Sequence, residues 1–160
     1  MTPAAPRPLF RDPVFDGAAD PTLIWNPHEQ TWWMVYTARR ANLALADDVS
    51  WIHGTSLGVA STADGGATWL YRGTLEGLDI DPGVHTYWAP EIVQIGGTFH
   101  MFLSVINGLP STWSGHPRTI RHYESHDLWH WTYTATLDLS SELVIDACIF
   151  PLLNGGWRLW

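Results

Sequence analysis

The 160-residue chain has few charged side chains, a single cysteine and no long apolar run. Because Cys148 has no second cysteine to pair with, no internal disulfide can form, which fits a reducing compartment. No stretch approaches the roughly 20 apolar residues that a membrane-spanning helix needs. The opening residues, MTPAAPRPLFRDPVF, also lack the apolar core of a secretory signal. We therefore expect a cytoplasmic protein without a membrane partner.

Basic residues are scarce as well. Eight basic residues stand against sixteen acidic ones, which gives a net charge of −8. This balance argues against nucleic acid or an anionic membrane as a partner. Hydrophobic residues make up 46% of the chain, so wholesale disorder is excluded and one core of useful size can be buried.

Tryptophan, in contrast, is abundant, with eleven residues. We expect most of the indoles to lie in a large core. Some could instead line a sugar site, because the C–H faces of sugar rings pack on aromatic rings while their hydroxyls remain free to hydrogen-bond. Together with the acidic balance, the aromatic content favours a neutral polyol as ligand.

Long helical periodicity is missing, and the pattern predicts β-structure almost throughout. Short runs rich in aromatic and β-branched residues, such as TWWMVYTA and TFHMFLSVI, alternate with clusters of Gly, Pro, Asn and Asp. The segment Ala38–Ser50 is the one that could be mistaken for a helix, and we interpret it mainly as a long loop.

Two patterns repeat along these predicted strands. The first is an acidic residue, an apolar strand, a turn and an aromatic-led strand, and it occurs with Asp20, Glu91 and Asp146 in the leading position. The second is a hairpin with Ser, Asp and Trp in order, and its two copies alternate with the first pattern: Ser61, Asp64 and Trp69, then Ser125, Asp127 and Trp131. Two hairpins in a repeat of about 60 residues are typical of a β-propeller blade.

The sequence therefore predicts an all-β fold with about two and a half blades of a β-propeller. Blade one would span residues 20–73, blade two 89–135 and the start of blade three 144–160, with connecting loops at 74–88 and 107–118. The first strand of each blade lines the central channel, so the three leading carboxylates should meet at one pocket. Carboxylates brought together raise one another's pKa, which suits acid–base chemistry on a glycosidic bond. A simple turn cap is the alternative role for any one of them.

Several motifs together resemble the family 43 glycoside hydrolases, five-bladed β-propeller enzymes that act on arabinose, xylose or related sugar linkages. The residues that carry the resemblance are Ala19-Asp20-Pro21, Tyr87 to Glu91 (YWAPE), Ser125 to Leu128 with Trp131, and Ile145-Asp146. The resemblance implies a glycosidase in which Asp20 is the general base and Asp146 tunes the pKa and orientation of the acid. Glu91 would help to form the site.

The same resemblance places the general acid, a glutamate, about one blade of roughly 60 residues beyond Asp146, past Trp160. We therefore expect the chain to be part of a longer enzyme and to be inactive by itself. Its substrate would be a plant or microbial oligosaccharide or polysaccharide.

Other binding candidates are Trp88 and Tyr87, which could stack on sugar rings, the pair Arg39 and Arg40, which could bind hydroxyls or a carboxylate, and His53. The arginines could equally be a solvated loop pair. No HxH or HExxH spacing occurs among the eight histidines, so no metal or cofactor is predicted. Some relatives hold calcium near the channel, which leaves calcium possible through the resemblance alone.

Two other interpretations of the sequence remain open. Residues Thr62 to Trp69 match the Asp-box pattern of sialidases, but that box is a structural turn, and sialidases also need an arginine cluster and a tyrosine nucleophile. Alternatively, the chain is a non-catalytic, lectin-like propeller. In either case, the open edges of its sheets could lead to self-association.

Overall fold

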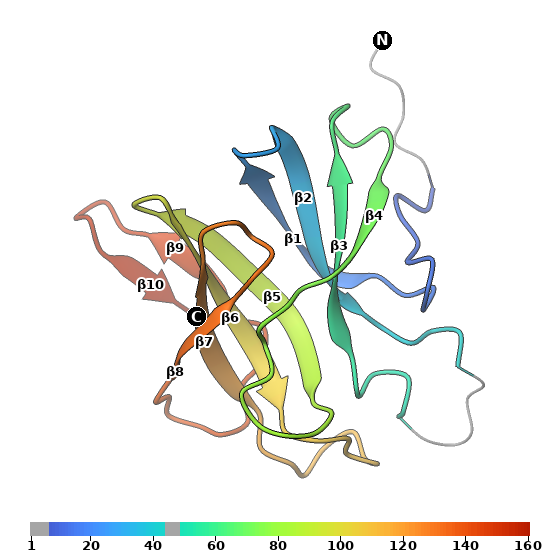
Figure 1. Cartoon of the computed structure of the whole chain (residues 1–160). Helices are drawn as coiled ribbons and strands as arrows, with labels where there is room; N and C mark the ends of the chain where they lie inside the picture. Colours follow the sequence, from blue (N-terminus) through green and yellow to red (C-terminus); the bar gives the residue numbers. More distant parts are fainter. Residues whose placement is uncertain (1–6, 44–48) are drawn as a thin grey trace.

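The computed structural model describes residues 7–43 and 49–160 and shows an all-β chain built from three antiparallel sheets (Figure 1). This confirms the predicted partial propeller. The first sheet contains β1 (Ala19–Asn26), β2 (Thr31–Ala38), β3 (Ser56–Thr62) and β4 (Leu70–Thr74). The second contains β5 (Thr86–Ile95), β6 (Thr98–Ile106), β7 (Thr119–Ser125) and β8 (Thr132–Thr136). A short third sheet pairs β9 (Ile149–Pro151) with β10 (Trp157–Leu159).

Both four-stranded sheets are simple meanders, in which each strand pairs with the next one along the chain. The first strand of the second sheet, β5, packs against β1, β2 and β3 of the first sheet. It begins at Thr86, inside the predicted loop 74–88, because Thr86 to Trp88 pair with Ile106 to Ser104 of β6. Of the predicted loop 38–50, Ala38 is the last residue of β2, and the described part after it contains an isolated bridge at Arg40. Residues 44–48 lie outside the described residues.

The main hydrophobic core lies between the first two sheets. Alternate side chains of a strand lie on one face, and on these strands the inward set is apolar. The two sheets contribute Trp33, Val35, Leu57 and Val59 on one side and Phe99, Met101, Leu103 and Tyr123 on the other, each at most 2% exposed. Complete burial of one such side chain stabilises the fold by about 1.5–3 kcal/mol. This core therefore fixes the two sheets relative to each other.

Most tryptophans lie outside that core, contrary to the expectation from composition. Trp33, Trp88 and Trp131 are buried, whereas five of the eleven indoles are exposed. Strand periodicity explains part of this difference. Trp33 faces the second sheet, so its neighbour Trp32 lies on the opposite face of the first sheet, where it makes an edge-on contact with Trp25.

The repeated Ser-Asp-Trp hairpins form self-contained turns. In the first sheet, the Asp64 carboxylate accepts hydrogen bonds from the Thr62 hydroxyl and from the backbone and hydroxyl of Thr68. In the second sheet, the Ser125 hydroxyl donates to Asp127. The Asp box in this chain thus holds its own hairpin, in agreement with its interpretation as a structural turn.

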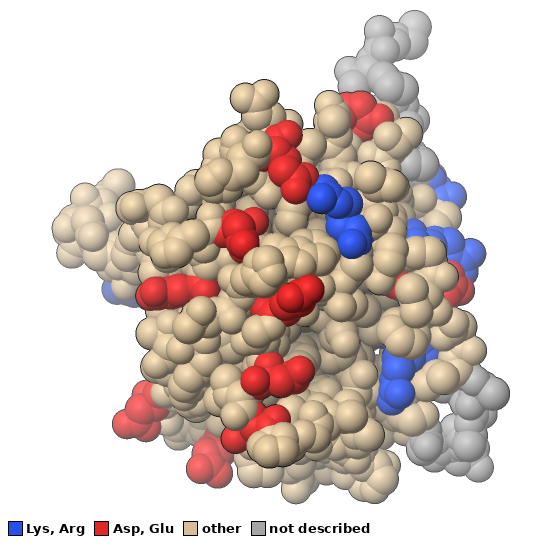
Figure 2. All heavy atoms as spheres, in the orientation of Figure 1, with Lys and Arg blue, Asp and Glu red and all other residues tan. Residues whose placement is uncertain are grey.

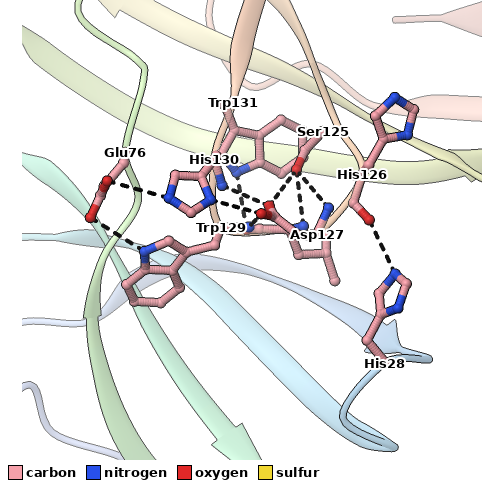
Figure 3. A network of polar contacts seen from close by, with 9 residues as sticks. His28, Glu76, Ser125, His126, Asp127, Trp129, His130 and Trp131 are labelled. Atoms are coloured by element: carbon pink, nitrogen blue, oxygen red, sulfur yellow. Dashed lines mark hydrogen bonds and ion pairs between the residues drawn. The ribbon is translucent and has the colours of Figure 1, made fainter.

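The turn between β7 and β8 also contacts Glu76, which lies in the segment between β4 and β5 that connects the two sheets (Figure 3). Asp127 lies 2.7 Å from the ring of His130, and the opposite side of that ring lies 3.6 Å from Glu76. Hydrogen bonding to Asp127 raises the pKa of His130. Backbone hydrogen bonds add to this link, since Glu76 donates to the Trp129 carbonyl and accepts from the Trp131 amide.

On the face of the molecule shown in Figure 2, uncharged side chains cover most of the surface. The acidic side chains are spread over it, and the basic side chains form small separate groups. Within residues 7–43 and 49–160, no helix has the length and apolar character needed to cross a membrane.

Candidate functional site

Asp20 and Asp146 lie at one pocket of about 200 Å³. Asp20 is at the start of β1, and Asp146 lies just before β9, so the two carboxylates come from the first and last parts of the fold. The remaining lining residues come from the intervening segments: Arg39, Ile52, Trp88, Trp113 and Ile145. The structure therefore brings together two of the three carboxylates that the repeat predicted.

An unusual backbone conformation occurs at both pocket carboxylates and at one further residue, Ala89. Asp20, Ala89 and Asp146 all have positive φ angles, of 49°, 44° and 59°. In β1 and β5 the residue coincides with a β-bulge, a device that turns side chains and is common beside active sites. The left-handed backbone conformation costs a non-glycine residue roughly 1–2 kcal/mol of folding free energy. Because this conformation recurs at equivalent positions, we infer that it serves to position the groups of the site.

Buried hydroxyl groups hold two of these positions in place. The backbone N–H of Ala89 donates to Thr37 Oγ1 at 2.9 Å, and that of Asp146 donates to Ser104 Oγ at 3.0 Å. Thr37 and Ser104 occupy equivalent places near the ends of β2 and β6 and are at most 1% exposed. The second strand of each sheet thus positions the start of the next sheet. Apart from a hydroxyl residue late in each of these two aromatic-led strands, no sequence pattern indicates this role.

Glu91 differs from the expectation. The strands β1 and β5 carry the same bulge, and in this register Ala89, followed by Pro90, is the structural equivalent of Asp20 with Pro21. Glu91 falls two residues further on. Its carboxylate does not line the pocket of Asp20 and Asp146. It accepts a hydrogen bond from the backbone N–H of Ile149 at 3.3 Å, and so ties β5 to β9.

The two pocket carboxylates have different electrostatic surroundings. Asp20 forms an ion pair with Arg39, 3.0 Å from Arg39 Nη2 to Asp20 Oδ2, and the Arg39 guanidinium also lies over the ring of Trp51. The pKa of Asp146 is raised, first by burial and second by the charge of Asp20, while Arg39 opposes the rise. Neighbouring carboxylates in unlike environments are the arrangement that acid–base catalysis requires.

Aromatic rings form one wall of the pocket. Trp88 is buried and its indole N–H donates to the Ile52 carbonyl at 2.7 Å, which fixes the ring orientation. Trp113, from the segment between β6 and β7, stacks with Trp88 at 6.4 Å between centroids and is 56% exposed. No sequence motif singled out Trp113, because it lies in a loop without a repeated pattern.

His53 supports this wall and does not line the pocket. Its ring stacks with Trp88 at 5.5 Å and an interplanar angle of 19° and is 1% exposed. Burial lowers its pKa, although the nearby Pro110 carbonyl opposes this effect. A neutral imidazole therefore packs against Trp88.

Tyr87 and Arg40 point away from the pocket. The Tyr87 hydroxyl donates to Asp79 at 2.6 Å, in a separate cavity of about 380 Å³ that His85 also lines. The Arg40 guanidinium donates to the carbonyls of Ser50 and His53. Because successive side chains of an extended chain lie on opposite faces, Trp88 and Arg39 reach the pocket while their sequence neighbours do not.

The lining of the pocket, as far as the structure describes it, does not suit a calcium ion. Calcium takes six to eight oxygen ligands, whereas the described lining side chains offer two carboxylates, one of them already paired with Arg39. A guanidinium at the site further disfavours a dication.

No protein-family model and no curated protein matches the sequence. Three similar solved structures are an arabinanase from Bacillus subtilis, a family 117 glycoside hydrolase from Zobellia galactanivorans and a family 43 glycoside hydrolase from Bacillus licheniformis. Their sequence identities to the chain are 17%, 16% and 19%, with TM-scores of 0.59, 0.51 and 0.53.

The matches cover 89%, 81% and 94% of this chain but only 46%, 42% and 28% of the three enzymes. The chain thus spans less than half the length of each of these structures. Sequence identities below 20% support a shared fold and not a shared function. The chain has the β-propeller fold seen in glycoside hydrolases of families 43 and 117, over less than half of their length.

Proposed function

We propose that the pocket binds a neutral saccharide of the arabinose or xylose class and that its two carboxylates serve hydrolysis of a glycosidic bond. The observation that carries the proposal is the meeting of Asp20, from β1, and Asp146, from the segment before β9, beside Trp88 and Trp113. Aromatic faces bind sugar rings, and carboxylates bind their hydroxyls. The fold shared with glycoside hydrolases supports the same chemistry.

In this proposal Asp20 acts as general base on the attacking water, and Arg39 orients the Asp20 carboxylate through their ion pair. Asp146, whose pKa is raised, adjusts the acidity and position of a separate proton donor. Among residues 7–43 and 49–160, no third carboxyl group lines the pocket. We therefore expect the 160-residue chain alone to bind saccharide without measurable hydrolysis.

Isothermal titration with arabinotriose and xylotriose tests the proposal. The expected result is saturable binding with a Kd of about 1 mM or tighter, at least several-fold weaker in Trp88→Ala and in Asp146→Asn. Trp25→Ala is the matched control, because Trp25 is an exposed indole on the first sheet outside the pocket, and it should bind like the wild type. Absence of binding, or equal losses in Trp25→Ala, would contradict the proposal, and hydrolysis by the pure chain would contradict the division of roles.

A non-catalytic sugar-binding role is the second candidate, and the solvent-exposed Trp113 favours it. Asp20→Asn separates the two: in a lectin-like site, stacking would preserve sugar binding, whereas in a full-length enzyme of the proposed kind the same change would abolish turnover. A sialidase-like role has less support. Among the residues that the structure describes, Arg39 is the one arginine lining the pocket, whereas carboxylate recognition by sialidases uses several.

A further inference from the structure

Two histidines and a glutamate meet on the face of the second sheet that is turned away from the core. Phe99, Met101 and Leu103 of β6 face the first sheet, so the alternate residues His100 and Phe102 lie on the opposite face. The strand register places Glu124 of β7 directly across from His100 and His122 directly across from Phe102. His100, His122 and Glu124 therefore form a cluster across two neighbouring strands.

Potential ligand atoms of the three residues converge. His100 Nδ1 lies 3.0 Å from His122 Nε2 and 3.5 Å from Glu124 Oε1. All three atoms lie within 4.8 Å of one another. The cluster is open to solvent on one side, since the His100 side chain is 18% exposed and that of Glu124 is 44% exposed. An ion can therefore reach it without unfolding.

We propose that His100, His122 and Glu124 form a binding site for a divalent transition metal of the zinc class. Zinc–nitrogen bonds of about 2.0–2.1 Å at tetrahedral to octahedral angles place two ligand nitrogens roughly 2.9–3.4 Å apart, which matches the separation of the two imidazole nitrogens. Two imidazoles with one carboxylate suit zinc, cobalt, nickel and copper, whereas calcium and magnesium prefer oxygen ligands.

The surroundings hold one of the ligands in position. The ring of Phe102 stacks on His122 at 4.8 Å between centroids, with an interplanar angle of 7°. Such outer contacts orient metal-binding imidazoles. A bound ion would link β6 to β7 by side-chain ligation in addition to their backbone hydrogen bonds. Because the ligands come from two different strands, they have no local HxH or HExxH spacing by which the sequence would indicate a metal site.

The site is separate from the saccharide pocket, whose lining includes none of its three residues, so the proposal does not depend on the proposed function. Its test is isothermal titration of the chain with zinc chloride, repeated in Cys148→Ser because Cys148 is an exposed thiol. We expect one ion per chain in both. His100→Ala and His122→Ala should each weaken binding roughly tenfold or more, and Glu124→Gln should weaken it less. His126→Ala, at an exposed histidine outside the cluster, is the matched control and should bind like the wild type.

Histidine NMR of the wild-type chain keeps the test independent of whether a variant folds. Added zinc should shift the ring resonances of His100 and His122 and leave those of His126 unchanged. The proposal is overturned if zinc up to about 1 mM gives no saturable binding, which would make the contact an ordinary histidine–histidine hydrogen bond. It is equally overturned if ions bind with unchanged affinity to His100→Ala and His122→Ala, or if other histidines shift in their place.

Discussion

Two charged neighbours act in opposite directions on Asp146. After burial, the carboxylate of Asp20 is the next largest cause of its raised pKa, and Arg39 counteracts both. We therefore predict that Asp20→Asn lowers the pKa of Asp146 towards its ordinary value and that Arg39→Gln raises it further. Carbon-13 NMR titration of the side-chain carboxyl groups measures both shifts. Asp138→Asn, which replaces an exposed carboxylate that does not act on Asp146, should change nothing.

The same shift fixes the sign of a pH effect on stability. Because folding raises the pKa of Asp146, its contribution is fully present below the ordinary pKa of aspartate and is lost as the pH rises through the folded value. Asp146→Asn should then unfold at a higher temperature than the wild type at neutral pH, and this gain should vanish in acid. A gain that stayed constant with pH, or a loss at neutral pH, would contradict the raised pKa.

The sequence repeat correctly predicts that Asp20 and Asp146 lie at one pocket, but it wrongly places Glu91 there as well. The repeat aligns residues by type and approximate spacing, whereas the strand register, with the same one-residue bulge in β1 and β5, makes Ala89 the equivalent of Asp20 and Glu91 the equivalent of Thr22. Arg40 and Tyr87 were candidates for a similar reason. Their types suit a sugar site, but strand alternation turns them to the opposite side from Arg39 and Trp88.

Among the elements, the connection between β4 and β5 depends on a glycine. Gly77 has a positive φ of 84°, and a Cβ there would overlap the backbone carbonyl of Trp131, which directly precedes β8 of the second sheet. Gly97, with a φ of 91°, has no atom within 4 Å of such a Cβ. Both alanine variants meet the same backbone strain of about 1 kcal/mol, so their difference isolates the overlap.

We predict that Gly77→Ala lowers the free energy of unfolding by at least about 2 kcal/mol more than Gly97→Ala does. Urea unfolding followed by tryptophan fluorescence gives both values. Equal losses in the two variants would show that the close approach of the connection to Trp131 does not hold in solution.

The strands themselves were the most predictable elements, because aromatic and β-branched runs are separated by clear turn residues. The start of β5 was missed, since Thr86 to Trp88 adjoin a segment rich in Gly, Pro and Asp and their pairing with β6 is long-range. The positions of Trp113 and of the metal-ligand candidates escaped prediction for the same reason: tertiary packing, and not local pattern, brings them to their partners.

For the whole molecule, the pocket depends on the assembly of all three sheets. It takes Asp20 from β1, Trp88 from β5 and Asp146 from the segment leading into β9, with Trp113 supplied by the loop between β6 and β7. The chain covers less than half of the enzymes that share its fold, so hydrolysis and its substrate are proposals, and self-association through open sheet edges stays a prediction.

The most direct measurement is an NMR titration of the indole N–H resonances with arabinotriose or xylotriose. Trp88 and Trp113 line the pocket, whereas Trp25 and Trp32 lie on the first sheet outside it. A saccharide site in this pocket predicts saturable shifts of the Trp88 and Trp113 signals, with the Trp25 and Trp32 signals unmoved. In Asp146→Asn the same sugar concentration should give clearly smaller shifts. Shifts confined to Trp25 and Trp32, or no shift with either sugar, would contradict the account.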